Sequence, residues 1–202
     1  MKTENPEAST LWSILIPTLP IREQMFQTLV QDLNHQISLA GVESQVQVVS
    51  LSDNRTLSIG AKRNRLLQMA TGEYVSFVDD DDRVAPDYIH QVYNILLRKP
   101  DVVGIVGEIS TPFPLSNKKH RAKFYHTIRN KKYYRSMRGY ERPPNHLNPM
   151  RRDIAIKYDF EDSSMGEDTD WAMRICLDGV LKREVFLPRV IYYYDFQPQK
   201  DY

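Results

Sequence analysis

Blocks of apolar and polar positions alternate along the first half of the chain and favour strands and helices in turn. Short apolar runs span Trp12–Ile16, Val46–Leu51, Tyr74–Val78 and Val102–Val106. Runs of this length, rich in β-branched and aromatic residues, are typical of buried strands. Each is separated from the next by a longer segment with helical spacing. Strands that alternate with helices predict an α/β fold around a mostly parallel sheet.

The signals at the ends of the intervening segments support three helices. Apolar residues recur at helical spacing after Pro20, and Gly41 ends this first helix. Ser58 has a hydroxyl that can cap the second helix, which stops before Gly72. Pro86 opens the third.

The alternation breaks down in the second half of the chain. We expect an irregular excursion over residues 118–152, with a helix near Ala122–Lys132. A last helix is predicted from Glu167 through Leu177. Two closing strands, Val185–Leu187 and Val190–Tyr194, are expected after it.

Length and charge refine this picture. The 202 residues favour one domain, and the hydrophobic fraction of 41% is sufficient for a single core. The formal net charge is only +1, but its distribution is uneven. Twelve Lys or Arg and one acid lie between Lys118 and Arg152, whereas the rest of the chain has 15 basic and 25 acidic residues. We call residues 118–152 the basic segment.

Cysteine use and hydropathy bear on the compartment. The single cysteine, Cys176, cannot form an intramolecular disulfide, which favours a reducing, cytoplasmic setting. The polar first ten residues lack the apolar core of a signal peptide. No apolar run is long enough to span a bilayer, so any membrane association is expected to be peripheral.

Four consecutive aspartates, Asp79–Asp82, directly follow the third predicted strand. Ligands of open α/β sheets bind beyond the carboxyl ends of the strands, so these carboxylates are expected to face a crevice. Adjacent carboxylates repel one another unless a cation compensates them, and such oxygen ligands suit Mg²⁺ or Mn²⁺. The alternative is a solvated turn in which Asp82 caps the next helix.

Two further groups lie at the same predicted edge. Asp53 follows the second strand, where its carboxylate can accept a hydrogen bond from a nucleobase, while Pro17 and Thr18 can shape the base pocket. Lys62 and Arg63 occupy the first turns of a helix, where cations oppose the helix dipole unless an anion is nearby. The alternatives are a turn residue for Asp53 and surface charge for the two cations.

A third acidic group, Glu167 and Asp168, begins the last predicted helix. The helix dipole alone favours acids in a first turn, so a structural cap is one interpretation. The other is a carboxylate placed in a cleft, where it takes the proton from an attacking hydroxyl.

In this order, the motifs resemble family 2 glycosyltransferases, which have a nucleotide-diphospho-sugar transferase (GT-A type) fold. The similarity is dense from Trp12 to Pro86 and patchy from Asn148 to Arg174. The matching segments are Ser13–Thr18, Val48–Asp53, Gly60–Asn64, Ala70–Asp82 and Gly166–Asp168 through Arg174.

The resemblance implies a single domain over residues 1–202, with a nucleotide-sugar-binding half (12–108) and an acceptor and catalytic-base half (109–202). It implies that Asp53 contacts the base, usually uracil, in a pocket lined by Pro17 and Thr18. Arg63 would lie near the diphosphate or hold the aspartate cluster in place, and Lys62 would contribute to binding of the nucleotide-sugar.

The resemblance also assigns roles to the acidic groups. Asp81 would be the direct ligand of Mn²⁺ or Mg²⁺. Asp79 would contact the ribose or the sugar and is the second candidate for a metal ligand. Asp80 would also bind the nucleotide-sugar. Asp168, with Glu167 beside it, matches the catalytic base of an inverting enzyme. Thus the implied activity is metal-dependent transfer from a nucleotide-sugar, with a UDP-sugar as the leading donor.

The sequence departs from the family pattern in two places, one of which bears on the type of enzyme and the other on the base contact. No Gln-x-x-Arg-Trp sequence is present, which argues against a processive polysaccharide synthase. The second strand ends in Leu51-Ser52-Asp53 rather than in paired acids, which leaves the base contact on Asp53 alone.

The basic segment interleaves cations with aromatic residues and permits three interpretations. It is a flap that closes on the diphosphate, a surface for an anionic acceptor (a glycan, a lipid phosphate or a nucleic acid), or a charged loop without function. His120, His126 and His146 are expected to be surface or acceptor contacts, and the alternative is that one of them completes the coordination of the metal.

Two other functions remain open. One is a nucleotidyltransferase of related fold, although Pro17-Thr18-Leu19-Pro20 stands where a Gly-rich phosphate loop would be expected. The other is a nucleic-acid-binding module that uses the basic segment, since cation-plus-aromatic surfaces suit single strands.

Overall fold

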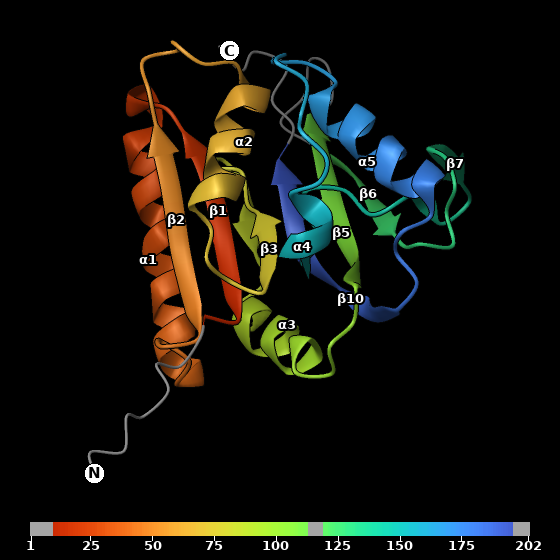
Figure 1. Ribbon diagram of the computed structural model, residues 1–202, viewed down its shortest axis with the longest axis horizontal. Coiled ribbons are helices and arrows are strands. Elements are labelled where there is room, and N and C mark those ends of the chain that lie inside the picture. The colour runs from red at the N-terminus through yellow and green to blue at the C-terminus, as the bar shows by residue number, and fades with distance from the viewer. Residues whose placement is uncertain (1–9, 113–118, 196–202) are drawn as a thin grey trace.

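A single mixed sheet forms the centre of the computed structural model, which describes residues 10–112 and 119–195 (Figure 1). Within these residues the strand order is β2-β1-β3-β9-β5-β6-β8-β7, with β10 beside β5 and β4 beside β10. The strands are β1 (Trp12–Thr18), β2 (Val46–Ser52), β3 (Tyr74–Phe77), β4 (Arg83–Val84), β5 (Val102–Pro112), β6 (Lys119–His126), β7 (Tyr134–Ser136), β8 (Gly139–Arg142), β9 (Met150–Arg151) and β10 (Glu184–Asp195).

Helices cover both faces of this sheet. They are the short 3-10 turn η1 (Pro20–Arg22), α1 (Glu23–Ala40), α2 (Ile59–Met69), α3 (Tyr88–Leu96), α4 (Arg152–Ala155) and α5 (Glu167–Asp178). Helices α1 and α3 pack on one face, and α2, α4 and α5 pack on the other (Figure 1). Alternate residues of β1 enter the two cores, Ile14 and Ile16 one and Leu15 the other. Burial on both faces explains the uninterrupted apolar run Ile14–Pro17 in β1.

The first half of the chain follows the sequence prediction. All four predicted strands and the three helices between them form, and β5 extends further than expected, to Pro112. Gly41 ends α1 in the left-handed conformation with φ 65°. The hydroxyl of Ser58 caps α2 by accepting the N–H of Ala61 at 3.0 Å. The α/β fold with a mixed, mostly parallel sheet flanked by helices is confirmed.

The prediction of a helix at Ala122–Lys132 is wrong. Residues 119–126 form β6, which pairs antiparallel with β5 over eight residues. The backbone groups along the extended β5 edge satisfy those of β6, and this tertiary pairing outweighs local helix propensity. Over residues 119–152 the basic segment contributes β6, β7, β8 and β9 to the sheet, joined by turns and loops, so it is not irregular throughout.

The two closing strands predicted near the C-terminus form one strand, β10. It runs parallel to β5, with register shifts between Phe186 and Val190 and again before Tyr192. Pro188 explains the gap in the sequence pattern, since it has no N–H to contribute to a ladder.

The parallel strands β1, β2 and β3 bring their carboxyl ends to one edge of the sheet. The segments that follow these ends carry most of the predicted site residues. No helix in the described parts of the chain is both long and apolar enough to cross a bilayer.

Candidate active site

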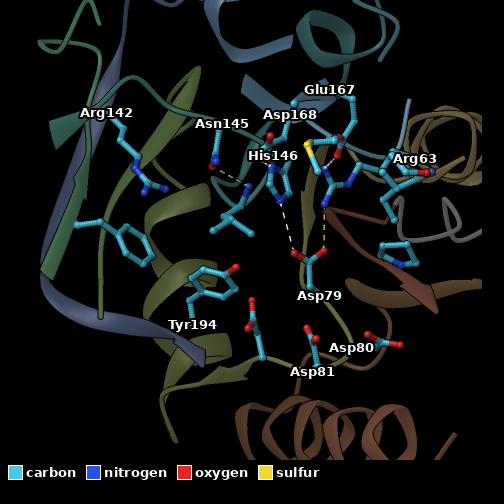
Figure 2. A pocket seen from close by; sticks show the side chains of 18 of the residues that line it. Arg63, Asp79, Asp80, Asp81, Arg142, Asn145, His146, Glu167, Asp168 and Tyr194 are labelled. Atoms are coloured by element: carbon cyan, nitrogen blue, oxygen red, sulfur yellow. Dashed lines mark hydrogen bonds and ion pairs between the residues drawn. The ribbon is translucent and has the colours of Figure 1, made fainter. Parts of the chain in front are cut away.

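A cavity of about 380 Å³ opens beyond the carboxyl ends of these strands (Figure 2). Its lining comes from segments far apart in the sequence. They are the end of β1, α2, the acidic run after β3, β6, β8 with the loop that follows it, the start of α5 and the end of β10. The volume lies in the range of small-molecule sites.

The acidic run is held in place by specific donors. Asp80, 2% exposed, accepts from the Thr18 hydroxyl at 2.7 Å and from Arg22 at 2.9 Å. Asp82, 5% exposed, accepts from the Tyr192 hydroxyl at 2.8 Å. Burial raises the pKa of Asp80, although the contacts with Thr18 and Arg22 oppose the rise. The alternative of a solvated turn is therefore wrong.

Arg63 connects the two acidic groups that the sequence singled out. From α2, its guanidinium donates to Asp79 Oδ1 at 3.1 Å and to Glu167 Oε1 at 2.5 Å (Figure 2). The same group lies over the rings of Phe77 and Phe160, 5.7 Å from each centroid. Burial alone would lower the pKa of Arg63, but the neighbouring carboxylates raise it. The cation in the first turns of α2 is thus explained by internal anions.

His146 lies between two carboxylates of the cavity. Its Nε2 is 3.8 Å from Asp79 Oδ2, and its Nδ1 is 3.6 Å from Asp168 Oδ2. Both separations exceed a hydrogen bond, so the interaction is electrostatic. Burial would raise the pKa of Asp79 and of Asp168, but for both of them the positive charges of Arg63 and His146 lower it.

Glu167 and Asp168 differ in their surroundings although they are neighbours. Burial raises the pKa of Glu167 despite its contact with Arg63. The pKa of Asp168 is lowered, and its side chain is about one third exposed. When the surroundings move the pKa values of two neighbouring carboxyl groups in opposite directions, the two groups can take different chemical roles. Asp168 is the more exposed of the two carboxylates, and Glu167 is the one that contacts Arg63.

A second cavity of about 350 Å³ adjoins the first. Pro17, Arg22 and Ile59 line both, and Thr18 and Lys62 line the second. It lies on the β1 and α2 side of the site, where the sequence predicts the nucleotide base.

Asp53 and Lys62 are engaged with each other and with the backbone. The Asp53 carboxylate accepts the backbone N–H groups of Thr56 at 2.6 Å and Leu57 at 2.8 Å. It also forms an ion pair with Lys62, whose ammonium donates to the Thr18 carbonyl at 2.7 Å. The Lys62 charge is therefore neutralised internally, and Asp53 lines neither cavity.

The structure brings together Pro17, Arg63, Asp79, Asp80, Asp81, Glu167 and Asp168 around the first cavity. It adds residues that the sequence did not single out: Arg22, Arg142 and Asn145. His146, expected at the surface or on the acceptor, lies within the site. Tyr194, at the end of the second predicted closing strand, also lines the cavity. Side chains alternate along a strand, so Tyr192 and Tyr194 of β10 lie on the same face. This alternation is the sequence signal that could have predicted Tyr194 in the site.

No group of three or more His, Cys, Asp or Glu side chains suited to a metal occurs among residues 10–112 and 119–195. Arg63 contacts Asp79, and Arg22 contacts Asp80. Asp81 lines the cavity, with Arg22 3.4 Å from its Oδ2. Of these three ion pairs, the one between Arg22 and Asp81 is the longest.

The fold and the position of the site are those of open α/β proteins, in which ligands bind beyond the carboxyl ends of parallel strands. The family model described as glycosyl transferase family 2 matches residues 32–158, and the chain belongs to this family. No curated protein matches the sequence significantly.

Solved structures of TarS from S. aureus share the fold. TarS matches with a TM-score of 0.60 and 18% identity over 94% of this chain and 37% of that chain. TarS 1–349 in complex with UDP-GlcNAc gives a TM-score of 0.63 and 16% identity, over 95% and 60% of the two chains. The complex with UDP gives 0.61 and 17%, over 94% and 61%. The present chain thus spans less than two thirds of each of these proteins.

Proposed function

We propose that this protein is an inverting glycosyltransferase that moves a sugar from a nucleotide-diphosphate sugar to an acceptor hydroxyl. One observation supports this above all: Asp168 and the acidic run face the same cavity and are linked through Arg63 and His146. Family membership favours this activity over a nucleotidyltransferase or a nucleic-acid-binding module. The cytoplasmic location expected from the single cysteine stays a prediction.

A UDP-sugar is the proposed donor. The related fold of TarS 1–349 has been solved with UDP-GlcNAc and with UDP. In this chain the second cavity, lined by Pro17 and Thr18, would hold the base. The diphosphate and sugar would then lie in the first cavity, near Arg63 and Asp79. The division into a donor half (12–108) and an acceptor half (109–202) belongs to the same proposal.

Asp53 can still contribute to the base site by shaping it. Its carboxylate fixes the turn at Thr56 and Leu57, and its ion pair positions Lys62 under Thr18. A carboxylate has about four acceptor positions, so a further bond from a base is compatible with these contacts.

A divalent cation, Mn²⁺ or Mg²⁺, fits the acidic run when the donor is present. Such ions bind through one or two carboxylates together with substrate phosphates, so a preformed cluster of three protein ligands is not required. Asp81 would hold the cation, with Asp79 as a second candidate. When bound, it would offset the negative charge that grows on the departing diphosphate. Arg22 and Arg63 offset the charges of Asp80 and Asp79.

Asp168 is the proposed catalytic base. As the acceptor oxygen forms its bond to the anomeric carbon, its proton passes to the Asp168 carboxylate. The bond from that carbon to the diphosphate oxygen breaks, and its electron pair leaves with the nucleotide. This single displacement inverts the anomeric centre and needs no covalent enzyme intermediate. The lowered pKa of Asp168 keeps the carboxylate charged before each transfer.

Thermal unfolding with nucleotides tests the proposal. UDP and UDP-GlcNAc, each with Mn²⁺, should raise the melting temperature, because a ligand at 100 times its Kd stabilises the native state by about 2.7 kcal/mol. Uridine with Mn²⁺, which lacks the diphosphate, is the matched control and should give little shift. If no nucleotide-sugar stabilises the protein in the presence of either metal, the proposed function is wrong.

A further inference from the structure

Arg142 is a cation of the cavity that has no carboxylate partner in the described part of the chain. It comes from the end of β8 and lines the first cavity. Its guanidinium lies over the rings of Phe124, Tyr133 and Tyr140, 5.6–5.7 Å from their centroids. Stacking on rings holds the group in place but leaves the N–H donors in its plane available.

The surroundings of Arg142 differ from those of the other cavity arginines. Arg22 and Arg63 each have a carboxylate within hydrogen-bond distance. The neighbour of Arg142 on the adjacent strand is His126, whose pKa is lowered to about 3 by burial first and then by the Arg142 charge. His126 is therefore neutral near pH 7. A half-buried cation without an anion is costly, so an anion from outside is the natural complement.

The position of Arg142 separates it from the proposed donor site. The second cavity adjoins the first on the β1 and α2 side, whereas β8 lies at the other end of the sheet order. Figure 2 shows Asp168 and His146 between Arg142 and Arg63. An anion bound at Arg142 would thus lie across the catalytic base from the donor diphosphate, where an acceptor is expected.

A second guanidinium extends this positive surface beyond the cavity. Arg135 of β7 lies opposite Tyr140 in the strand register, 5.6 Å from the centroid of its ring. Arg135 is exposed, so its guanidinium is also open to a ligand. Two cations around one aromatic ring match a dianion better than a monoanion, and a phosphate monoester carries about −1.5 to −2 at pH 7.

We propose that Arg142 binds a phosphate group on the acceptor, while Arg135 adds positive charge beyond the cavity. The acceptor would be a phosphorylated sugar or polyol, with a free hydroxyl that reaches Asp168. This inference rests on the proposed function and assigns the acceptor class for the same site. The phosphate can belong to a soluble molecule or to a lipid headgroup, because the recognition chemistry is the same.

Binding of paired probes to the UDP-saturated protein tests this proposal. Glycerol 3-phosphate and glycerol are titrated by calorimetry, and side-chain ¹⁵N NMR follows the Arg142 Nε–H signal. Glycerol 3-phosphate should bind and shift that signal, whereas glycerol should not. The R142Q variant should bind the phosphate at least about tenfold more weakly, because a charge-assisted bidentate contact is lost. The R142K variant, which keeps the charge, should lie between the two.

The matched control is R121Q, which removes the same charge from the basic segment. Arg121 is exposed, pairs with Glu108 on the surface and does not line the cavity. This variant should bind glycerol 3-phosphate as the wild type does. Vesicles with and without phosphatidate form a second arm. Binding of both phosphate probes indicates a lipid headgroup, and binding of glycerol 3-phosphate alone indicates a soluble acceptor.

Three results would overturn the proposal: equal binding of glycerol and glycerol 3-phosphate, equal losses in R142Q and R121Q, or weaker UDP binding in R142Q. The last would place Arg142 on the donor. UDP-induced stabilisation, measured on the same samples, separates this outcome from failure of the proposed function. If UDP stabilises the protein but phosphate does not reach Arg142, only the acceptor assignment fails.

Discussion

Arg63 and Glu167, 104 residues apart in the chain, are joined by a 2.5 Å hydrogen bond between Nη1 and Oε1. The other nitrogen of the guanidinium fork donates to Asp79. One buried side chain therefore ties the strand that carries the acidic run to the helix that carries the proposed base. The geometry of the active site depends on this link as much as on the sheet.

Replacing Arg63 by Gln should destabilise the fold as well as the site. It leaves Asp79 and Glu167 without their cation, and breaking a buried ion pair in this way typically costs about 3–5 kcal/mol. Urea unfolding of the ligand-free protein measures the loss. Arg65→Gln, at an exposed position of the same helix, is the control and should change stability by less than about 0.5 kcal/mol. Equal stabilities for the two variants would contradict the role given to Arg63.

Asp81→Ala should remove the metal-dependent part of donor binding. Asp81 lines the cavity, and its longer contact with Arg22 is consistent with a role toward a ligand. We expect the melting temperature of the variant with UDP-GlcNAc to be the same with Mn²⁺ and with EDTA. Asp153→Ala, which removes an exposed carboxylate paired with Arg151, should retain the difference. A metal-dependent shift that survives in Asp81→Ala would exclude Asp81 as the ligand.

Asp168→Asn should preserve donor binding and slow the reaction. The amide keeps the shape of the side chain but cannot accept the acceptor proton. A positioned base contributes about 10²–10⁴-fold, so UDP release from UDP-GlcNAc, with water as acceptor, should fall by that order. UDP binding, measured by calorimetry, should stay within a factor of about two of the wild type. Full turnover in this variant would show that another group takes the proton.

The first half of the fold could be predicted because its signals are local. Apolar runs, the Ser58 cap and the Gly41 stop act within a few residues, and all appear in the structure. The position of the acidic run follows in turn, since the carboxyl ends of parallel strands share one edge. The sequence therefore predicted correctly that the aspartates of this run face a cavity.

The second half resisted prediction because pairing between distant strands determines it. Residues 119–126 become a strand only because β5 offers its edge, and His146 and Arg142 enter the site through that extension. The contacts of Lys62 with other groups of the protein could not be predicted from the sequence either. Its charge suggested a phosphate contact, but Asp53 and the Thr18 carbonyl occupy it. Sequence patterns place residues on elements, but pairing between side chains depends on the tertiary structure.

Asp53 should contribute stability that depends on pH even without a nucleotide. Burial alone would raise the pKa of Asp53, but hydrogen bonds from Lys62, Leu57 and Thr56 lower it to about 2. A folded-state pKa below the unfolded value of 3.8 stabilises the protein above pH 3.8, and this contribution is lost as the pH falls through about 2. Wild type should therefore exceed Asp53→Asn in stability near pH 6, and the difference should disappear toward pH 2. Chemical denaturation across this range measures it. A difference that is independent of pH would contradict the pKa assignment.

His146→Ala should raise the pKa of Asp168 and move the acidic limb of the rate profile to higher pH. Burial favours the neutral form of Asp168, and the interaction with His146, whose Nδ1 is 3.6 Å from Asp168 Oδ2, opposes this. Without that interaction the carboxylate protonates at a higher pH, and a protonated Asp168 cannot accept the acceptor proton. Carboxyl ¹³C NMR gives the Asp168 pKa directly, and UDP release against pH gives the functional counterpart. His35→Ala, at an exposed position on α1, should leave both unchanged. An unaltered Asp168 pKa in His146→Ala would mean that Arg63 alone sets the charge of the base.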